Sequence, residues 1–207
     1  MSNPIPDIVV SRLPEYYNTL KAMQAEGKQT TSSRELGERL GISAAQIRKD
    51  LSQFGEFGKQ GTGYLISFLV DQLQTILNVG RSWDVAVVGA GNLGKAIAHY
   101  HGFAPQGFNI KLVFDNNPEI IGTAVGNLKV LDIKDLVPSV TQAGIKIAMI
   151  TVPDEAAQAV AAELVKAGIQ GILNYSATPL NLPDHIFHLR HSDAVVQLQH
   201  ITYYIGK

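Results

Sequence analysis

The sequence contains no cysteine. This absence excludes disulfide bonds, cysteine-based zinc sites and thiol catalysis, and it is compatible with a reducing compartment. No run of residues approaches the roughly eighteen apolar positions that a membrane-spanning helix needs. Residues 1–7 lack the basic start and the long apolar core of a signal peptide. We therefore expect a cytoplasmic protein that has no membrane partner.

Net charge is also small. Lysine and arginine total 17 against 18 aspartate and glutamate, which gives −1 at pH 7. The overall charge therefore does not by itself indicate a nucleic-acid partner. With 207 residues, of which 45% are hydrophobic, the chain is long enough for one or two domains with a sizeable core. The six histidines lack the spacing of a metal site, so we expect solvated or structural roles for them and no bound metal.

The clearest motif starts with a short β-branched run at 84–88, which predicts a strand buried on both faces. A G-x-G-x-x-G sequence follows at Gly89, Gly91 and Gly94, and then a helical pattern begins. This spacing predicts a tight turn at the first glycine, close approach of a pyrophosphate at the second, and tight helix-to-strand packing at the third. The phosphates are expected at the helix N-terminus. The alternative is that the glycines only make a tight turn.

A second strand at 110–114 ends at Asp115, about twenty residues beyond the last glycine. A carboxylate at that position accepts hydrogen bonds from the adenosine ribose hydroxyls and repels a 2′-phosphate. The expected cofactor is therefore NADH or NAD⁺ rather than the phosphorylated forms.

The alternation of strands and helices continues to residue 173. Strands are expected at 127–130, 145–151 and 169–173, with helices at 132–142 and 154–167, which predicts an α/β domain with a doubly wound parallel sheet of the Rossmann type. Ligands bind beyond the carboxyl ends of such strands. Residues 151–153 and 174–176 are therefore expected beside the cofactor, with Tyr175 flanking the nicotinamide. For each of these two segments the alternative is an ordinary exit from strand to loop. The cofactor residues predicted on these grounds are Gly89, Ala90, Gly91, Asn92, Leu93, Gly94, Asp115, Asn116, Thr151, Val152, Pro153, Asn174 and Tyr175.

The first eighty residues predict a separate, helical unit. A helix is expected at 11–25, with Ser11 as N-cap and Pro14 in the first turn. A second is expected at 34–40, capped by Ser32 or Ser33, and Glu35 falls three residues after Ser32 as in a capping box. A third helix follows the glycine turn and runs to residue 54. Two short helices joined in this way are typical of a helix-turn-helix.

A glycine-rich stretch at 55–64 then predicts a β-hairpin wing that approaches a phosphate or the minor groove. The alternative is a three-helix unit without DNA binding, because residues 1–80 carry eight basic and eight acidic side chains. Binding would have to depend on a local patch and on dimerisation. The predicted DNA-binding residues are Arg12, Ser43, Gln46, Arg48, Lys49, Ser52, Lys59, Gly61 and Tyr64.

Two further helices complete the chain. The first, at 64–79, is expected to connect the two domains, and the second, at 194–205, carries a broad apolar stripe. A sheet domain that is already covered on both faces leaves this stripe for a second subunit, by symmetric packing or by helix exchange. The alternative is a helix folded back on its own domain. The expected division is 1–80 for DNA binding, 81–190 for the dinucleotide and 191–207 for dimerisation.

The helix-to-wing sequence and the glycine loop together resemble the Rex family of redox-sensing transcriptional repressors. The resemblance covers nearly the whole chain, and its helix-to-wing motif is far more specific than the glycine loop. The residues that carry it are Ser43, Gln46, Ile47, Arg48, Lys49, Asp50, Leu51, Ser52, Phe54, Gly55, Phe57, Gly58, Gly61, Gly63 and Tyr64, then Gly89 to Gly94 and Thr151 to Pro153.

The resemblance implies a homodimer with an exchanged C-terminal helix and N-terminal winged helices that bind a palindromic operator. NADH would close the dimer and release the DNA, while NAD⁺ competes weakly, and the regulated genes would be those of respiration and fermentation. Arg48, Lys49 and the wing from Lys59 to Tyr64 would meet DNA. Tyr100 and Asp193 match family positions near the nicotinamide, with Asp193 reaching across the dimer.

Two positions depart from the family pattern. Asn18 stands where many relatives have an arginine that could pair with Asp193, and Ala194 stands where relatives often have an aromatic residue. Both substitutions bear on how strongly the cofactor and the DNA are coupled.

Two other functions remain open at this point. One is an NAD-dependent dehydrogenase whose first eighty residues mediate oligomerisation, but residues 82–190 are consumed by the dinucleotide fold and leave no substrate domain or evident catalytic arrangement, so we expect no enzyme. The other is a nucleotide-binding scaffold that does not bind DNA.

Overall fold

The computed structural model describes residues 5–55, 57, 63–183 and 188–205. The chain divides into two compact units, Met1–Arg81 and Ser82–Lys207. Most of the predicted wing, including Lys59 and Gly61, lies outside the described residues, as does His185.

Unit 1 is mainly helical. Its helices and strands are α1 (Asp7–Ala25), β1 (Thr30–Thr31), α2 (Ser33–Leu40), α3 (Ala44–Leu51), a 3-10 turn (Ser52–Phe54), β2 (Tyr64–Leu65) and α4 (Ile66–Leu77). Helix α1 contacts both α4 and α2, and a single apolar core joins α1, α2, α3 and α4. Strands β1 and β2 pair antiparallel, Thr31 opposite Tyr64. The helix-turn-helix predicted from the sequence is therefore present.

The start of α1 differs from the sequence prediction. The helix begins at Asp7, with Pro6 as N-cap, so Ser11 lies inside it and donates from Oγ to the carbonyl of Ile8 at 3.0 Å. Pro14 lies in the interior rather than in the first turn. The apolar stripe is weak in this first turn, because Val9 is buried but Ile8 and Val10 are exposed.

Helix α2 keeps the predicted cap at Ser32 but not the complete capping box. Ser32 Oγ accepts from the backbone N–H of Glu35 at 3.1 Å. The Glu35 side chain does not complete the box but accepts from Thr31 Oγ1 and pairs with Lys28. Gly41 ends α2 at φ +67°, in the left-handed region that favours glycine.

Unit 2 is built on a seven-stranded sheet in the order β5-β6-β4-β3-β7-β8-β9. The strands are β3 (Trp83–Val88), β4 (Phe108–Asp115), β5 (Ala124–Val125), β6 (Leu128–Asp132), β7 (Ile147–Ile150), β8 (Gly171–Asn174) and β9 (His188–His191). All neighbours pair parallel except β5, which runs antiparallel to β6. The predicted doubly wound parallel sheet is confirmed.

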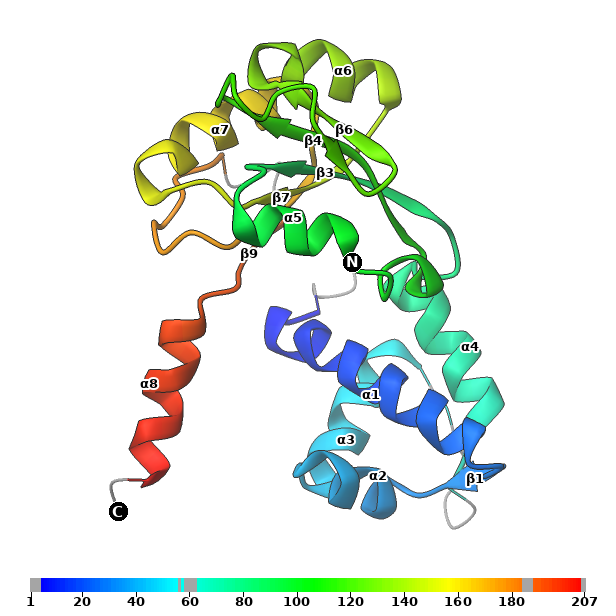
Figure 1. Cartoon of the computed structure of the whole chain (residues 1–207). Coiled ribbons are helices and arrows are strands. Elements are labelled where there is room, and N and C mark those ends of the chain that lie inside the picture. Colours follow the sequence, from blue (N-terminus) through cyan, green and yellow to red (C-terminus); the bar gives the residue numbers. More distant parts are fainter. Residues whose placement is uncertain (1–4, 56, 58–62, 184–187, 206–207) are drawn as a thin grey trace. The chain divides into compact units, whose positions relative to one another are not determined.

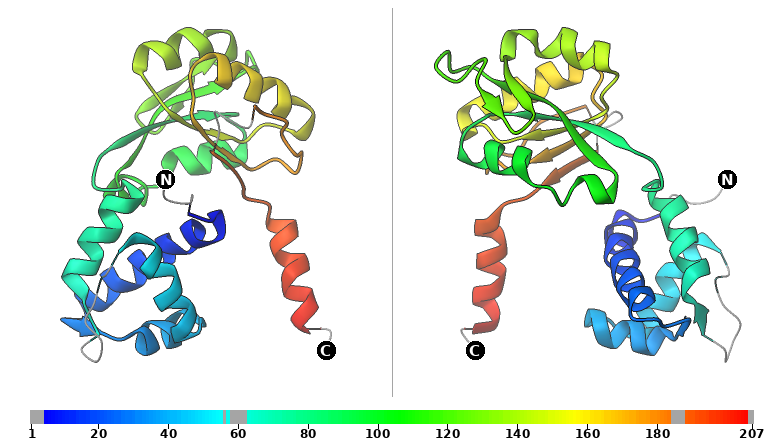
Figure 2. Two further views of the ribbon diagram at one scale, coloured as in Figure 1. Left: turned by 180° about the vertical axis from the view of Figure 1, so that it is seen from behind. Right: turned by 45° about the vertical axis from the view of Figure 1, so that its right-hand side comes forward.

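Helices cover both faces of this sheet (Figures 1 and 2). On one face α6 (Leu136–Ala143) and α7 (Asp154–Lys166) bury apolar side chains against alternate strand residues such as Ala86 and Val88. On the other face α5 (Asn92–His99) buries Ile97 against Val85 and Val87. The central strand β3 is therefore buried on both sides, as its continuous apolar run indicates.

The C-terminal part of the chain contains one unpredicted strand and one correctly predicted helix. Strand β9 pairs parallel with β8, His191 opposite Asn174. Helix α8 (Ala194–Ile205) matches its predicted range. Every one of its described residues is exposed, including Leu198 at 60% and Ile205 at 75%.

Candidate cofactor and DNA sites

The glycine loop joins β3 to α5 and has the geometry that the motif requires. Gly89 lies at φ +103°, and a Cβ there would come 2.7 Å from the carbonyl of Thr151. A Cβ on Gly94 would collide with the carbonyl oxygen of Gly89. At Gly91, by contrast, a Cβ would meet no protein atom within 4 Å. The first and third glycines are therefore required by the protein itself, and the second leaves an open approach to the N-terminus of α5.

Thr151 fastens the end of β7 to this loop. Its backbone N–H donates to the carbonyl of Val88 at 2.8 Å, and its hydroxyl lies 2.8 Å from the carbonyl oxygen of Gly89. Thr151 thus holds the glycine loop by hydrogen bonds. It is followed by Val152 and by Pro153, which is the N-cap of α7. The carboxyl ends of β3 and β7 meet here, at the edge of the sheet where ligands of such folds bind.

Asp115 ends β4 and faces the same loop. Its Oδ2 accepts from the backbone N–H of Ala90 at 2.6 Å, and its Oδ1 accepts from the N–H of Asn117 at 2.8 Å. Each carboxylate oxygen has a second lone pair, so this arrangement leaves acceptor capacity for ribose hydroxyls. Of the predicted cofactor residues, the structure brings together Gly89, Ala90, Asp115 and Thr151. Asn92, Leu93 and Asn116 are exposed beside them.

Asn174, predicted as a cofactor residue, is fully buried, and the protein uses its side chain internally. Oδ1 accepts from the N–H and the hydroxyl of Ser176, and Nδ2 donates to the carbonyl of Thr178 at 3.1 Å and lies 3.2 Å from Nδ1 of His191. A direct cofactor contact by Asn174 stays a prediction. The bonds that it makes instead hold the loop that carries Tyr175, whose burial raises the pKa of its hydroxyl.

The two residues carried over from the family lie in different settings. Tyr100 follows α5, is 63% exposed, and packs edge to face with Phe103 at 5.1 Å. Asp193 precedes α8 and accepts from the N–H of Val195 at 2.7 Å, as an N-cap does. Their approach to the nicotinamide stays a prediction.

His99 has the structural role expected for the histidines. Its Nδ1 lies 2.7 Å from the carbonyl of Lys95, and its Nε2 accepts from the N–H of Gly126 at 3.0 Å. The ring thereby fixes the β5–β6 turn to α5. Helix α5 ends at His99, so His101 lies outside it. Within the described parts of the chain, no group of three His, Asp or Glu side chains could hold a metal ion.

Helix α3 corresponds to the recognition helix of the predicted helix-turn-helix. Ser43 caps it by accepting from the N–H of Gln46 at 3.2 Å. Arg48 and Lys49 are exposed, and Arg48 donates to Ser33 Oγ at 2.9 Å. Ser52 donates to the carbonyl of Lys49 at 2.8 Å. The two cations are thus displayed on the surface at the C-terminal half of α3.

Arg12, predicted to contact DNA, is bound inside the unit. Its Nε and Nη2 donate to both oxygens of Asp50, at 2.6 and 2.8 Å. Sequence reasoning missed Asp50, which is 38 positions away. Two signals are available: Asp50 belongs to the helix-to-wing motif, and it lies four residues from Gln46 on one helix face.

Tyr64, the last predicted DNA residue, is partly buried in the short β1–β2 ribbon. Burial raises the pKa of its hydroxyl, and the charge of Arg48 opposes that rise.

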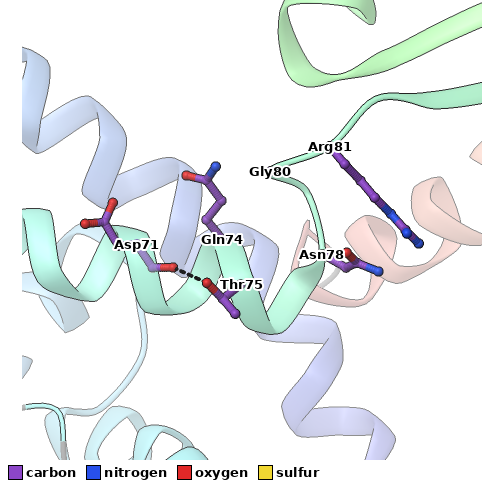
Figure 3. Close-up of a pocket in the computed structure, with 6 residues that line it drawn as sticks. All are labelled: Asp71, Gln74, Thr75, Asn78, Gly80 and Arg81. Carbon is purple, nitrogen blue, oxygen red and sulfur yellow. Dashed lines mark hydrogen bonds between the residues drawn. The ribbon is translucent and has the colours of Figure 1, made fainter.

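A cavity of about 320 Å³ lies at the C-terminal end of α4 (Figure 3). It is lined by Asp71, Gln74, Thr75, Asn78, Gly80 and Arg81. Thr75 donates to the carbonyl of Asp71 at 2.9 Å. None of the lining residues belongs to the predicted cofactor or DNA sites, so the cavity is separate from both.

These features define a class: a helix-turn-helix unit in the same chain as a doubly wound domain with a dinucleotide-type glycine loop. Two family descriptions match the same parts. "Putative DNA-binding protein N-terminus" matches residues 4–52, and "CoA binding domain" matches residues 81–178. Among the helices that the structure describes, none is long and apolar enough to cross a membrane.

Curated relatives match over nearly the full length. The redox-sensing transcriptional repressor Rex of Roseiflexus sp. (strain RS-1) is 46% identical, with 98% of this chain and 91% of the relative covered. The Rex protein of Chloroflexus aurantiacus is 45% identical, with 98% and 95% covered. The chain belongs to the Rex family of redox-sensing transcriptional repressors.

Solved structures of RSP, a Rex-family repressor, agree with this assignment. The crystal structure of RSP in complex with beta-NAD⁺ and operator DNA is similar with a TM-score of 0.92 at 35% identity, covering 99% of this chain and 94% of that one. The structure of RSP in complex with beta-NADH has a TM-score of 0.88 at 33% identity, with 99% and 95% covered.

Proposed function

We propose that this chain is a cytoplasmic repressor that binds palindromic operators as a homodimer and leaves them when NADH binds. The observation that supports this most directly is that one relative, RSP, forms complexes with NAD⁺ and operator DNA and with NADH, and that both structures match 99% of this chain. The operators would control genes of respiration and fermentation. The cofactor would lie on the Gly89 loop and Asp115, and the DNA would lie on α3.

Sensing requires unequal affinities. A ligand shifts a two-state dimer only by binding one state more tightly than the other. NADH and NAD⁺ differ at the nicotinamide ring, which is neutral in the first and positively charged in the second. A closed, apolar pocket favours the neutral ring because burying a cation is costly. NADH would therefore stabilise the closed dimer.

Closure of the dimer would affect DNA binding by changing the distance between the two recognition helices. Recognition helices of a dimer must lie about one helical turn of DNA apart to meet both half-sites. A closed dimer that changes this separation no longer fits the operator. Spin labels at position 48 in both subunits test this step. We expect different label separations with NADH and with DNA, and equal separations would contradict the mechanism.

The experiment that tests the function uses reciprocity. If NADH weakens DNA binding, then DNA must weaken NADH binding by the same factor. NADH affinity is measured with and without a palindromic duplex that the protein itself selects from a randomised library. We expect the duplex to lower NADH affinity, and no change would contradict the proposal.

The double variant Arg48→Ala/Lys49→Ala is the matched control. It should retain the NADH affinity of the wild type, lose the effect of the duplex, and lose most of the salt dependence of DNA binding. A scaffold that does not bind DNA would show no difference between the two proteins. Transfer of hydride to a small substrate would instead revive the dehydrogenase alternative.

A further inference from the structure

Asp50 is a buried carboxylate at the junction of α1 and α3. It is 0% exposed and accepts four hydrogen bonds. Arg12 donates two of them from α1, at 2.6 and 2.8 Å, and the Tyr16 hydroxyl donates a third at 2.6 Å. Gln46 donates the fourth from within α3, at 2.7 Å. Three of the four bonds therefore join the recognition helix to the first helix.

The chemistry of the cluster holds Asp50 in its charged form. Burial by itself raises the pKa of Asp50, but hydrogen bonds from Arg12, Tyr16 and Gln46 outweigh it, and the pKa lies below the ordinary value. The bond to Asp50 likewise raises the pKa of the Arg12 guanidinium. Removing either member of such a pair leaves a buried group without its partner, which is strongly unfavourable.

The position of Asp50 fixes the rotation of α3 about its own axis. Successive residues of an α-helix are about 100° apart, so Gln46 lies about 40° from Asp50 and Arg48 about 160° from it. Anchoring Asp50 against α1 therefore turns Arg48 outward, on the opposite side of the helix. A rotation of α3 that broke the cluster would move Arg48 and Lys49 away from the bases and phosphates that they are expected to meet.

From this geometry we propose that Asp50 is the positioning residue of the DNA-binding unit and that Arg12 acts through Asp50 rather than on a DNA phosphate. The inference rests on the proposed DNA binding. It reassigns Arg12, which the sequence alone places in the basic patch, and it gives a function to the acid that follows Arg48 and Lys49.

The test compares two affinities for each full-length variant: one for a duplex that the wild type selects from a randomised library, and one for poly(dI-dC). Base contacts specify and phosphate contacts do not, so a misdirected α3 should lower the first affinity and leave the second unchanged. For Asp50→Asn, which keeps the side-chain size, we expect the ratio of the two affinities to fall on the order of tenfold, about 1.4 kcal/mol.

Glu38→Gln is the matched control, because it removes the same charge from an exposed carboxylate of α2 that is 66% accessible. Its affinity ratio should equal that of the wild type. If Asp50 were only a negative charge near DNA, both Asp50→Asn and Glu38→Gln would raise affinity for both duplexes. That result would overturn the proposal.

Arg12→Met separates positioning from a phosphate contact. If Arg12 acts by holding Asp50, the variant Arg12→Met should lower the ratio of the affinity for the selected duplex to that for poly(dI-dC). The slope of log affinity against log salt for poly(dI-dC) should stay unchanged. A lost phosphate contact would lower both affinities and reduce that slope by about 0.9. Equal loss on both duplexes at constant slope would mean a purely structural role. Either of the latter two results overturns the proposal.

Tyr16→Phe covers the case in which the charged variants do not fold, since it removes one hydroxyl and keeps the buried ring. It should lower the ratio by a smaller factor, with an unchanged far-ultraviolet circular dichroism spectrum as the check that the helices of unit 1 are folded. An unchanged ratio would overturn the proposal. Failure of the wild type to select any duplex would instead contradict the proposed function.

Discussion

The carboxylate oxygen Oδ2 of Asp115 accepts a hydrogen bond of 2.6 Å from the backbone N–H of Ala90. The acid at the end of β4 thereby holds the glycine loop at the end of β3. In the sequence, Asp115 predicts a partner for ribose hydroxyls, and the structure adds a second task, because the same carboxylate fixes the loop on which phosphates are expected.

Asp115→Asn tests both tasks. An amide has only one acceptor oxygen, so it leaves either Ala90 N–H or Asn117 N–H without its partner, and it removes the charge that repels a 2′-phosphate. We expect weaker NADH binding and a smaller preference for NADH over NADPH. Fluorescence titration with both cofactors measures this, with Glu163→Gln on α7 as a charge control. An unchanged preference would contradict the assignment.

Gly91 and Gly94 provide a matched pair. Gly91→Ala should keep the stability of the wild type, since its Cβ meets no protein atom within 4 Å, but it should lower NADH affinity on the order of tenfold, about 1.4 kcal/mol. Gly94→Ala should lower the free energy of unfolding by about 1–3 kcal/mol because its Cβ meets the backbone of Gly89. Thermal unfolding and NADH titration of both variants give the comparison. Equal effects of the two substitutions on stability would contradict the assignment of Gly94 to the fold and of Gly91 to cofactor binding.

The lowered pKa of Asp50 predicts how unit 1 responds to acid. A carboxyl group whose folded pKa lies below its unfolded value contributes stability that is fully present above the unfolded pKa, near 3.8, and is lost as pH falls through the folded pKa. The stability difference between wild type and Asp50→Asn should therefore be constant at neutral pH and shrink below about pH 4. Hydrogen exchange of α1 and α3 amides measures it. A difference that does not shrink in acid would contradict the lowered pKa.

The exposed apolar side chains of helix α8 indicate that the protein is a dimer. Its described residues expose Val195, Val196, Leu198, Ile201 and Tyr204 together, each at least 49% accessible, and an apolar stripe of this kind marks an interaction surface. Leu198→Asp/Ile201→Asp should produce monomers that bind operator DNA weakly, because both half-sites are no longer held together. Sedimentation velocity measures the change. A wild-type monomer at micromolar concentration would count against the dimer.

Much of this arrangement can be predicted from local sequence. The glycine loop, the cap at Ser32 and the limits of α8 all follow from patterns within a few residues, which local physics determines. Strand β9 was missed because the sequence His188–His191 has neither apolar alternation nor β-branched residues. Its strand conformation comes from pairing with β8, and such tertiary context is not visible in a short window.

The sequence predicts which types of residue belong to the candidate sites better than it predicts their hydrogen-bond partners. Arg48 and Lys49 are exposed on α3 as expected. Arg12 is predicted as a DNA contact from its charge, and Asn174 as a cofactor contact from its place after a strand, and both contacts stay predictions. The structure adds their internal partners, Asp50 for Arg12 and the Ser176 loop for Asn174. A buried polar group must find a partner within the protein. Pairing across 38 residues, as for Arg12 and Asp50, becomes visible only in the fold.

The most direct test of the account is the release of DNA by NADH. A fluorescent palindromic duplex from the organism's own promoters is bound to the protein at fixed NAD⁺, and anisotropy is followed while NADH is added. We predict release as NADH rises, with the midpoint moving to higher NADH when NAD⁺ is increased. Tight binding that ignores NADH would contradict the account and would point to Asn18 and Ala194 as the positions where coupling is broken.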